Sequence, residues 1–133
     1  MDLTQIENYL IARDEISMAF VFGSVAAGSK RHESDLDLAI YFKTRHGEIE
    51  WESDARYPTE DQIWGDLERM AGREVDLLVL NRAPATICDT VLREGKPLFI
   101  RERKVYLDML LRVSIEAEDY RNFIEEFWKL KYA

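Results

Sequence analysis

The order of apolar and polar positions along the chain predicts strands and helices in alternation. The apolar run Ile16–Phe22 has the length and composition of a buried strand, and the run over residues 34–41 predicts a second one. An alternating run over residues 74–80 predicts a third strand, and Leu98–Ile100 predicts a short fourth. Elsewhere apolar residues repeat every three or four positions, which predicts helices over residues 3–13, 59–71 and 84–93.

Residues 101–133 read as helix with an apolar surface that is too wide for one face. One stripe runs along this segment: Tyr106, Met109, Leu110, Val113, Ala117, Tyr120, Ile124 and Phe127. Further apolar residues lie off that stripe: Leu107, Leu111, Phe123, Trp128 and Leu130. The pattern indicates that two surfaces of the segment are covered. Either it packs on its own domain and on a partner chain, or it is bent or broken and buries both faces internally.

Together these elements predict an α/β fold with a mixed sheet, helices covering one face, and a C-terminal helical segment. Local signals mark where helices begin and end. Thr59 and Gln62 match a capping box, and Gly72 follows the last apolar residue of the same helix. Gly95 ends the helix that follows.

Length, charge and composition limit the class of protein. The 133 residues predict a single domain over residues 1–133, and 26 acidic against 18 basic residues give a net charge of −8. This acidic balance argues against direct nucleic-acid binding. No apolar run is long enough to cross a membrane and the N-terminus lacks a signal-peptide pattern, so we expect a cytoplasmic protein. The single cysteine, Cys88, is expected to pack on a helix as a small apolar residue.

A polar motif joins the first two predicted strands. Gly23-Ser24 ends the first strand, and ten residues later Asp35-Leu36-Asp37 lies in the second. Glycine permits a sharp turn and close approach of a ligand, while Ser24 can cap a short helix whose free amides attract phosphate. Either fragment alone reads as an ordinary turn or a solvated strand edge. Together they favour a site for a nucleotide triphosphate and its metal ions.

Asp35 and Asp37 are two positions apart on a strand, so their side chains project from the same face. Two carboxylates placed in this way repel each other unless a cation lies between them. Mg²⁺ prefers oxygen ligands and shares its remaining positions with water and substrate phosphates. The pair therefore predicts a Mg²⁺ site.

The complete motif resembles the signature of the minimal nucleotidyltransferases of the DNA polymerase β-like superfamily, which has Gly-Ser followed at this spacing by Asp-x-Asp. The resemblance covers roughly residues 16–100, within an expected catalytic core over residues 1–100. It implies that Gly23 and Ser24 engage the triphosphate of ATP, and that Asp35 and Asp37 are catalytic residues that hold Mg²⁺. It also implies a third carboxylate on a later strand.

Asp76 is the candidate for that third catalytic and metal-binding carboxylate. In the alternating run over residues 74–80 it lies on the face opposite to Val75, among leucines. A lone carboxylate buried there needs a partner or a metal ion. Asp76 therefore either completes the metal site or forms a salt bridge with Arg73 or Arg82.

The shortness of the chain makes it resemble one group in the superfamily, the MNT antitoxins. That resemblance implies a toxin–antitoxin pair of type VII with a HEPN-domain RNase toxin as partner. The toxin is inactivated when AMP moves from ATP to one of its tyrosine hydroxyls. Two alternatives remain open. One is a nucleotidyltransferase for a small hydroxylated substrate such as an aminoglycoside, and the other is an antitoxin that acts by binding alone.

Overall fold

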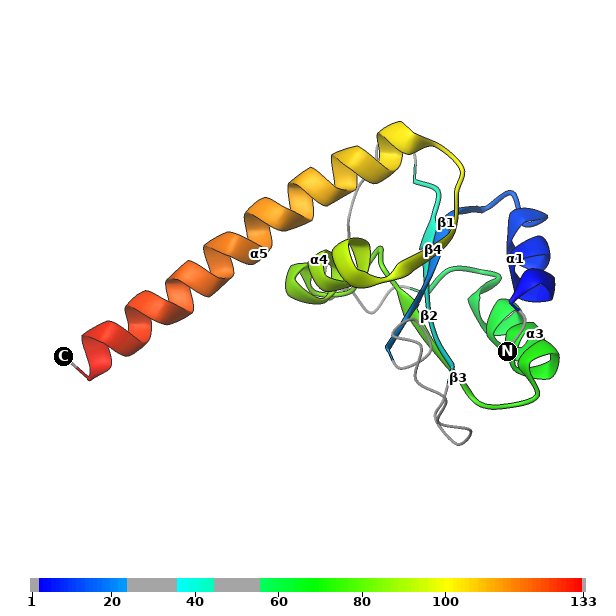
Figure 1. Cartoon of the computed structure of the whole chain (residues 1–133), viewed down its shortest axis with the longest axis horizontal. Coiled ribbons are helices and arrows are strands. Elements are labelled where there is room, and N and C mark those ends of the chain that lie inside the picture. The colour runs from blue at the N-terminus through cyan, green and yellow to red at the C-terminus, as the bar shows by residue number, and fades with distance from the viewer. Residues whose placement is uncertain (1–2, 24–35, 45–55, 133) are drawn as a thin grey trace.

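The computed structural model describes residues 3–23, 36–44 and 56–132, and Figure 1 shows a central sheet between two groups of helices. The elements are α1 (Thr4–Ile11), β1 (Ile16–Phe22), β2 (Leu36–Phe42), α3 (Glu60–Ala71), β3 (Val75–Val79), α4 (Ala85–Glu94), β4 (Lys96–Ile100) and α5 (Arg103–Lys131). All four predicted strands are present, and β4 begins two residues before the predicted start.

The sheet has the order β3-β2-β1-β4. β1 pairs antiparallel with both β2 and β4, while β2 and β3 run parallel. A parallel pair needs a crossover connection, and α3 lies in the connection between β2 and β3. The prediction of an α/β fold with a mixed sheet is confirmed.

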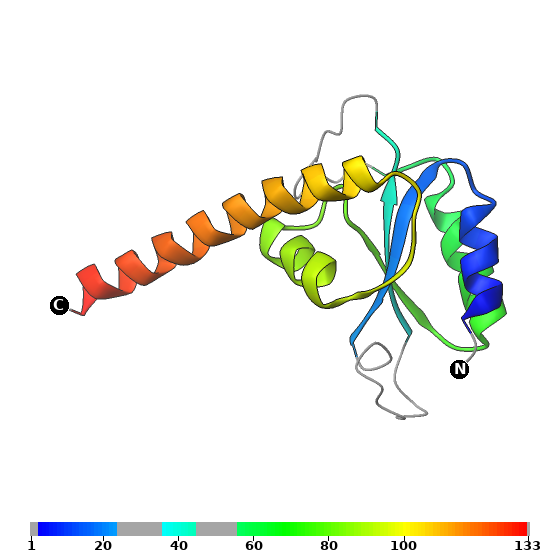
Figure 2. The same ribbon diagram turned by 45° about the horizontal axis from the view of Figure 1, so that its top comes forward.

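Helices cover both faces of this sheet, so the prediction of one covered face was wrong. α1 and α3 lie on one face, and α4 and the first half of α5 lie on the other, as two views of the ribbon show (Figures 1 and 2). The reason lies in β1, which is buried at every position from Ile16 to Val21 and therefore needs cover on both faces. Alternate residues of β1 and β2 belong to two separate apolar clusters, one under each pair of helices.

The observed helix ends agree in part with those predicted from the sequence. Gly72 ends α3 in the left-handed conformation with φ 65°, as predicted. The capping box was wrong, because the Thr59 hydroxyl makes no cap hydrogen bond and donates instead to Glu15 Oε2 at 3.0 Å. Gly95 follows α4 with an extended backbone, and glycine is required there because a Cβ would lie 2.5 Å from the Val91 carbonyl oxygen.

Cys88 lies on α4 and is fully buried, as expected for a small apolar residue. Burial raises the pKa of its thiol to about 12, so the thiol is neutral at physiological pH. A neutral, buried thiol is a poor nucleophile. We therefore assign Cys88 a packing role.

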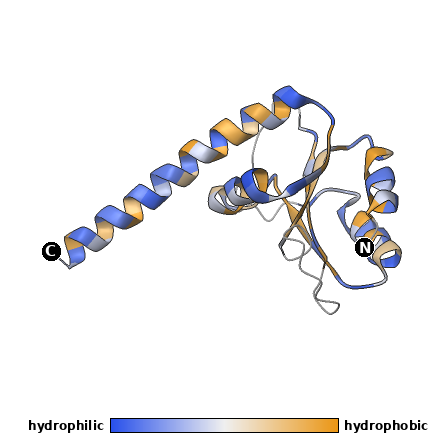
Figure 3. Ribbon diagram, viewed as in Figure 1, coloured by the Kyte–Doolittle hydropathy of each residue, from blue (hydrophilic) through white to orange (hydrophobic). Residues whose placement is uncertain are grey.

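α5 is one continuous helix of 29 residues, so of the two alternatives the bent or broken segment is wrong. Its first half packs against α4 through Met109, Val113 and Ala117, which are buried. Its second half extends away from the rest of the protein, and Figure 3 shows that apolar bands continue along it. No helix among residues 3–23, 36–44 and 56–132 is both long and apolar enough to cross a membrane.

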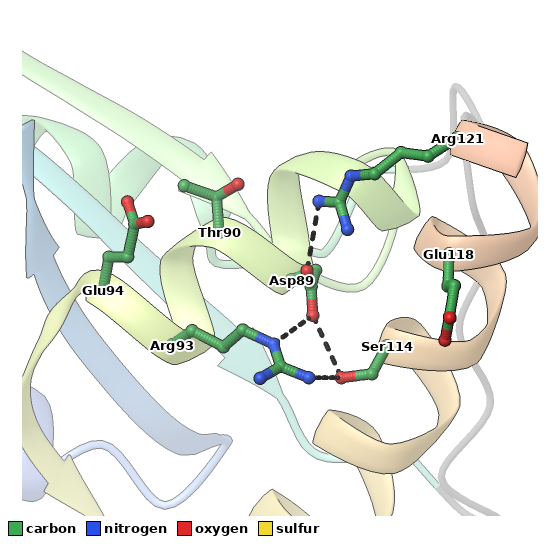
Figure 4. A pocket seen from close by; sticks show the side chains of 7 residues that line it. All are labelled: Asp89, Thr90, Arg93, Glu94, Ser114, Glu118 and Arg121. Carbon is green, nitrogen blue, oxygen red and sulfur yellow. Dashed lines mark hydrogen bonds and ion pairs between the residues drawn. The ribbon is translucent and has the colours of Figure 1, made fainter. Parts of the chain in front are cut away.

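A buried carboxylate on α4 ties α5 to the body of the protein. Asp89, whose side chain is 5% exposed, accepts hydrogen bonds from Arg93 Nε at 2.8 Å, Ser114 Oγ at 3.0 Å and an Arg121 guanidinium nitrogen at 3.2 Å (Figure 4). Ser114 and Arg121 both belong to α5. These groups line an open hollow of about 460 Å³ between the two helices.

We expect Asp89→Ala to lower the free energy of unfolding by about 1–3 kcal/mol at neutral pH, because a buried acceptor of charged hydrogen bonds is lost. Burial acts to raise the pKa of Asp89, but the bonds from Arg93, Ser114 and Arg121 outweigh it and hold the pKa below its ordinary value of 3.8. A carboxyl whose pKa is lowered by folding stabilises the protein above the ordinary pKa, and this contribution is lost as the pH falls below it.

Urea unfolding of both proteins at a series of pH values checks this expectation. The difference between them should be constant near neutrality and shrink in acid. A difference that is independent of pH down to the acid limit would contradict the assignment.

Candidate active site

Three sequence-predicted site residues lie together where β1 ends and where β2 and β3 begin. Asp37 is the register partner of Phe22 on β1 and of Asp76 on β3. Gly23 follows Phe22 directly and lies against Asp37. Neighbouring strands are about 4.8 Å apart, so the two carboxylates stand side by side on adjacent strands.

Gly23 has the left-handed φ of 74°, which favours glycine. A Cβ at this position would lie 2.2 Å from Asp37 Oδ2 and 3.1 Å from Asp37 Cγ. The Asp37 carboxylate therefore occupies the space that any other residue at position 23 would fill. The glycine of the motif therefore leaves room for the Asp37 carboxylate and also permits the turn.

Both carboxylates project from the sheet face that carries α4 and α5. The neighbours of Asp37 along β2, Leu36 and Leu38, belong to the cluster under α1 and α3, and alternation places Asp37 on the opposite face. Leu78 packs on the α4 side, and Asp76 shares its face. The predicted alternation of β3 is confirmed.

The expected burial of Asp76 was wrong, because its side chain is exposed while Asp37 is half-buried. Of the two possible salt-bridge partners, Arg73 stays a prediction and Arg82 binds another carboxylate. Arg82 donates two hydrogen bonds to Glu60, at 2.7 Å and 2.5 Å. Asp76 is the second residue of β3, a short strand at the edge of the sheet, and its exposed carboxylate is open to a ligand.

Ser24 and Asp35 lie outside the residues that the structure describes. Within the described ranges there is no group of three or more acidic, histidine or cysteine side chains able to hold a metal ion. Asp37 and Asp76 nevertheless supply the hard oxygen donors that Mg²⁺ prefers, from adjacent strands and on one face. Two carboxylates directly opposite each other repel, so a cation between them fits the donor set.

The start of β3, which carries Asp76, is held from outside the sheet by α3. Trp64 Nε1 donates to the Val75 carbonyl oxygen at 2.7 Å, and the Val75 amide donates to Glu68 Oε2 at 3.1 Å. Both main-chain polar groups of Val75 are thus bound by side chains. Because Val75 precedes Asp76, these bonds help to fix Asp76 opposite Asp37.

The other end of the same strand pair is fixed by Asn81, a fully buried polar residue. Its side-chain oxygen accepts from the Phe42 amide at 2.8 Å, and its side-chain nitrogen donates to the Phe42 carbonyl at 2.9 Å. The side chain thus extends the main-chain pairing of β2 beyond the end of β3. Sequence reasoning missed Trp64, Glu68 and Asn81, although an asparagine directly after an apolar strand is a signal for such a role.

We expect Glu68→Ala to lower the free energy of unfolding by about 1–2 kcal/mol and to loosen β3, because the Val75 amide loses its acceptor. Glu68→Gln keeps a side-chain oxygen and should stay close to the native protein. Hydrogen exchange of the peptide that contains Val75 measures the effect. Equal exchange in the alanine and glutamine variants would contradict this role for Glu68.

Comparison with known protein families shows the family of this chain. The family model of Polymerase beta, Nucleotidyltransferase matches residues 4–104, which include Gly23, Asp37 and Asp76. The chain belongs to this family. No curated protein matches the sequence significantly.

Solved structures share the fold of this nucleotidyltransferase over nearly its whole length. A chain of a toxin–antitoxin complex with AMP-PNP has a TM-score of 0.76 at 17% identity, with 100% of both chains covered. A chain of a complex of MntA with HepT has a TM-score of 0.65 at 17% identity, covering 98% of this chain and 100% of that one. A complex of tri-AMPylated Shewanella oneidensis HEPN toxin with MNT antitoxin has a TM-score of 0.68 at 15% identity, covering 99% and 100%.

Proposed function

We propose that this nucleotidyltransferase is the antitoxin of a HEPN/MNT toxin–antitoxin pair of the type VII kind. It moves AMP from ATP to a tyrosine hydroxyl of its HEPN-domain RNase partner in the cytoplasm and so inactivates the RNase. The observation that carries the proposal is the register of Asp37 with Asp76 beside Gly23. The fold it shares with chains of toxin–antitoxin complexes, one with AMP-PNP and one with an AMPylated toxin, supports the same function.

In this proposal, Gly23 and Ser24 bind the triphosphate, and Asp35, Asp37 and Asp76 hold Mg²⁺. The left-handed turn at Gly23 lets the main chain approach the phosphates closely. Mg²⁺, when bound, supplies positive charge for the phosphate oxygens and for the entering and leaving groups. Asp37 fixes the reacting end of the nucleotide because its carboxylate lies against the Gly23 turn.

Asp76 faces the acceptor. The tyrosine oxygen attacks the α-phosphorus of ATP and forms a new oxygen–phosphorus bond, while the bond from that phosphorus to the bridging oxygen of the pyrophosphate breaks. The hydroxyl proton passes to the Asp76 carboxylate as general base, and pyrophosphate leaves. The exposed position of Asp76 suits an acceptor that belongs to another macromolecule.

The modification explains inactivation by charge and size. AMP adds a bulky group with a negative phosphate to the tyrosine. Beside the catalytic centre of an RNase, that charge repels the RNA backbone and the adenosine blocks access. An antitoxin that acts by binding alone would add no AMP to the partner.

Transfer of label from ATP tests the reaction class. The chain is incubated with Mg²⁺ and the purified HEPN-domain protein encoded next to it, with ATP labelled at either the α- or the γ-phosphate. Nucleotidyl transfer labels the partner from α-labelled ATP only. Labelling from γ-labelled ATP, or no labelling of a partner that binds, contradicts the proposal.

A further inference from the structure

We propose that the second half of α5 is the docking surface for the partner, and that its occupant is an amphipathic helix with an apolar stripe and a basic end. The second half is defined here as residues 120–132 and is called the α5 tail. The inference rests on the proposed function for the identity of the partner. It rests on the exposed surface of α5 for the place of contact.

The apolar face of the α5 tail continues the face that α4 already covers. Met109, Val113 and Ala117 are buried against α4, and Tyr120, Ile124 and Phe127 follow on the same side with helical spacing. At about 1.5 Å per residue, α4 is ~15 Å long and α5 is ~44 Å long, so α4 ends well before the stripe does. A second helix in line with α4 would cover the remainder.

Apolar side chains on the tail are uncovered to an extent that a single chain does not explain. Among them, Tyr120 is 57% exposed, Phe123 66%, Phe127 47% and Trp128 46%. The Trp128 ring contacts the rings of Phe127 and Tyr132, which both belong to the tail. Contiguous exposed aromatic residues mark protein interfaces, and Trp and Tyr are enriched at their energetic centres.

Charge complementarity identifies one end of the occupant as basic, because three acidic side chains, Glu116, Glu118 and Asp119, lie directly before the tail. Along the tail itself the charges are largely matched: Lys129 lies 3.6 Å from Glu125 and 3.7 Å from Glu126. Arg121 is bound to Asp89 on α4. Glu116 and Asp119 lie beside the apolar face, one helical turn from Tyr120 and Phe123 respectively.

A second copy of this chain fits the tail less well than a basic partner. Each chain has a net charge of −8, so two copies of the chain repel each other. The tail also extends on the sheet side that carries Asp37 and Asp76, because α5 packs with α4 on that face. A partner held by the tail therefore lies on the side from which an acceptor tyrosine must reach the site.

The test measures binding without ATP between this chain and the purified HEPN-domain protein encoded next to it. The double variant Ile124→Ser, Phe127→Ser should bind about 30-fold more weakly or worse, the effect of losing central apolar contacts. Its melting temperature should match that of the native chain, because the buried residues of α5 are Met109, Val113 and Ala117, which the variant keeps. The variant Glu116→Lys, Asp119→Lys should associate more slowly and show a weaker dependence on salt.

The matched control is Leu111→Ser, which removes an apolar side chain that is 65% exposed on another face of the same helix. It should bind like the native chain. Loss of binding in this control but not in the tail variant overturns the proposal, as does a native chain that does not bind the partner. So does a native chain that forms a dimer by itself, if the tail variant is a monomer.

These experiments distinguish a failure of the docking proposal from a failure of the proposed function. A partner that binds through the tail but acquires no AMP would support the docking surface and contradict the proposed reaction. A partner that binds the native chain and the tail variant with equal affinity, and acquires AMP equally from both, would support the reaction and contradict the docking surface.

Discussion

Asp37→Asn should lower the rate of AMP transfer by about a thousandfold or more, since the loss of one group that stabilises transition-state charge alone costs ~10²–10³. Asparagine keeps the size of the side chain but not the negative charge that holds a cation. The substitution should not destabilise the fold, because it relieves repulsion between Asp37 and its register partner Asp76. Transfer is followed with α-labelled ATP, and stability by thermal unfolding without Mg²⁺.

A second readout links the loss to metal binding and not to turnover alone. Mg²⁺ with ATP should raise the melting temperature of the native chain, because a ligand that binds only the folded state stabilises it. The Asp37→Asn and Asp76→Asn variants should lose most of that rise. Asp108→Asn is the matched control, since Asp108 is an exposed aspartate on α5, and it should behave like the native chain. An active Asp37→Asn variant would refute the assignment of the site.

Gly23→Ala should abolish detectable transfer and also lower the free energy of unfolding, by about 1–3 kcal/mol for a non-glycine residue forced into the left-handed region. The new Cβ would lie 2.2 Å from Asp37 Oδ2, so the carboxylate must move. The two effects are separated by comparing the label transferred with the urea midpoint of the same preparation.

Gly72→Ala is the control for backbone strain. Gly72 has a left-handed φ of 65°, close to that of Gly23, but a Cβ there meets nothing within 4 Å. It should therefore cost stability and leave transfer intact. If both alanine variants lose transfer equally, the effect of Gly23→Ala does not come from a clash with the Asp37 carboxylate.

The sheet could be predicted because its strands carry strong local patterns. Ile16–Phe22 is apolar throughout, and its uniform burial matches that pattern. The same pattern also implied cover on both faces, which the prediction of a single covered face overlooked. The parallel pairing of β2 with β3 depends on a crossover through α3, and no local pattern encodes its direction.

The arrangement of the candidate site could be predicted in part. The motif pointed to Gly23 and Asp37, which lie together, and the alternation of β3 placed Asp76 on the same sheet face as Asp37. The exposure of Asp76 could not be read from its leucine neighbours, because it depends on where β3 lies in the sheet. The bonds of Trp64 and Glu68 to Val75 link residues that only the packing of α3 brings together.

The helix signals show how tertiary contacts override local rules. Thr59 matched a capping box, yet its hydroxyl bonds to Glu15, 44 positions away. Residues 101–133 carry an apolar stripe along their whole length, yet its buried residues lie only in the half beside α4. In each case the pattern is present in the sequence, but the contact that the residues make depends on groups distant in the chain or outside it.

Intact mass spectrometry of the HEPN-domain protein encoded next to this chain tests the central claim most directly. The partner is incubated with the chain, ATP and Mg²⁺, beside an Asp37→Asn control, and its RNase activity is measured in the same samples. The account predicts a gain of one or more AMP masses on a tyrosine, loss of RNase activity, and neither change with the control. A partner that is inhibited without any gain in mass would contradict the account and leave an antitoxin that acts by binding alone.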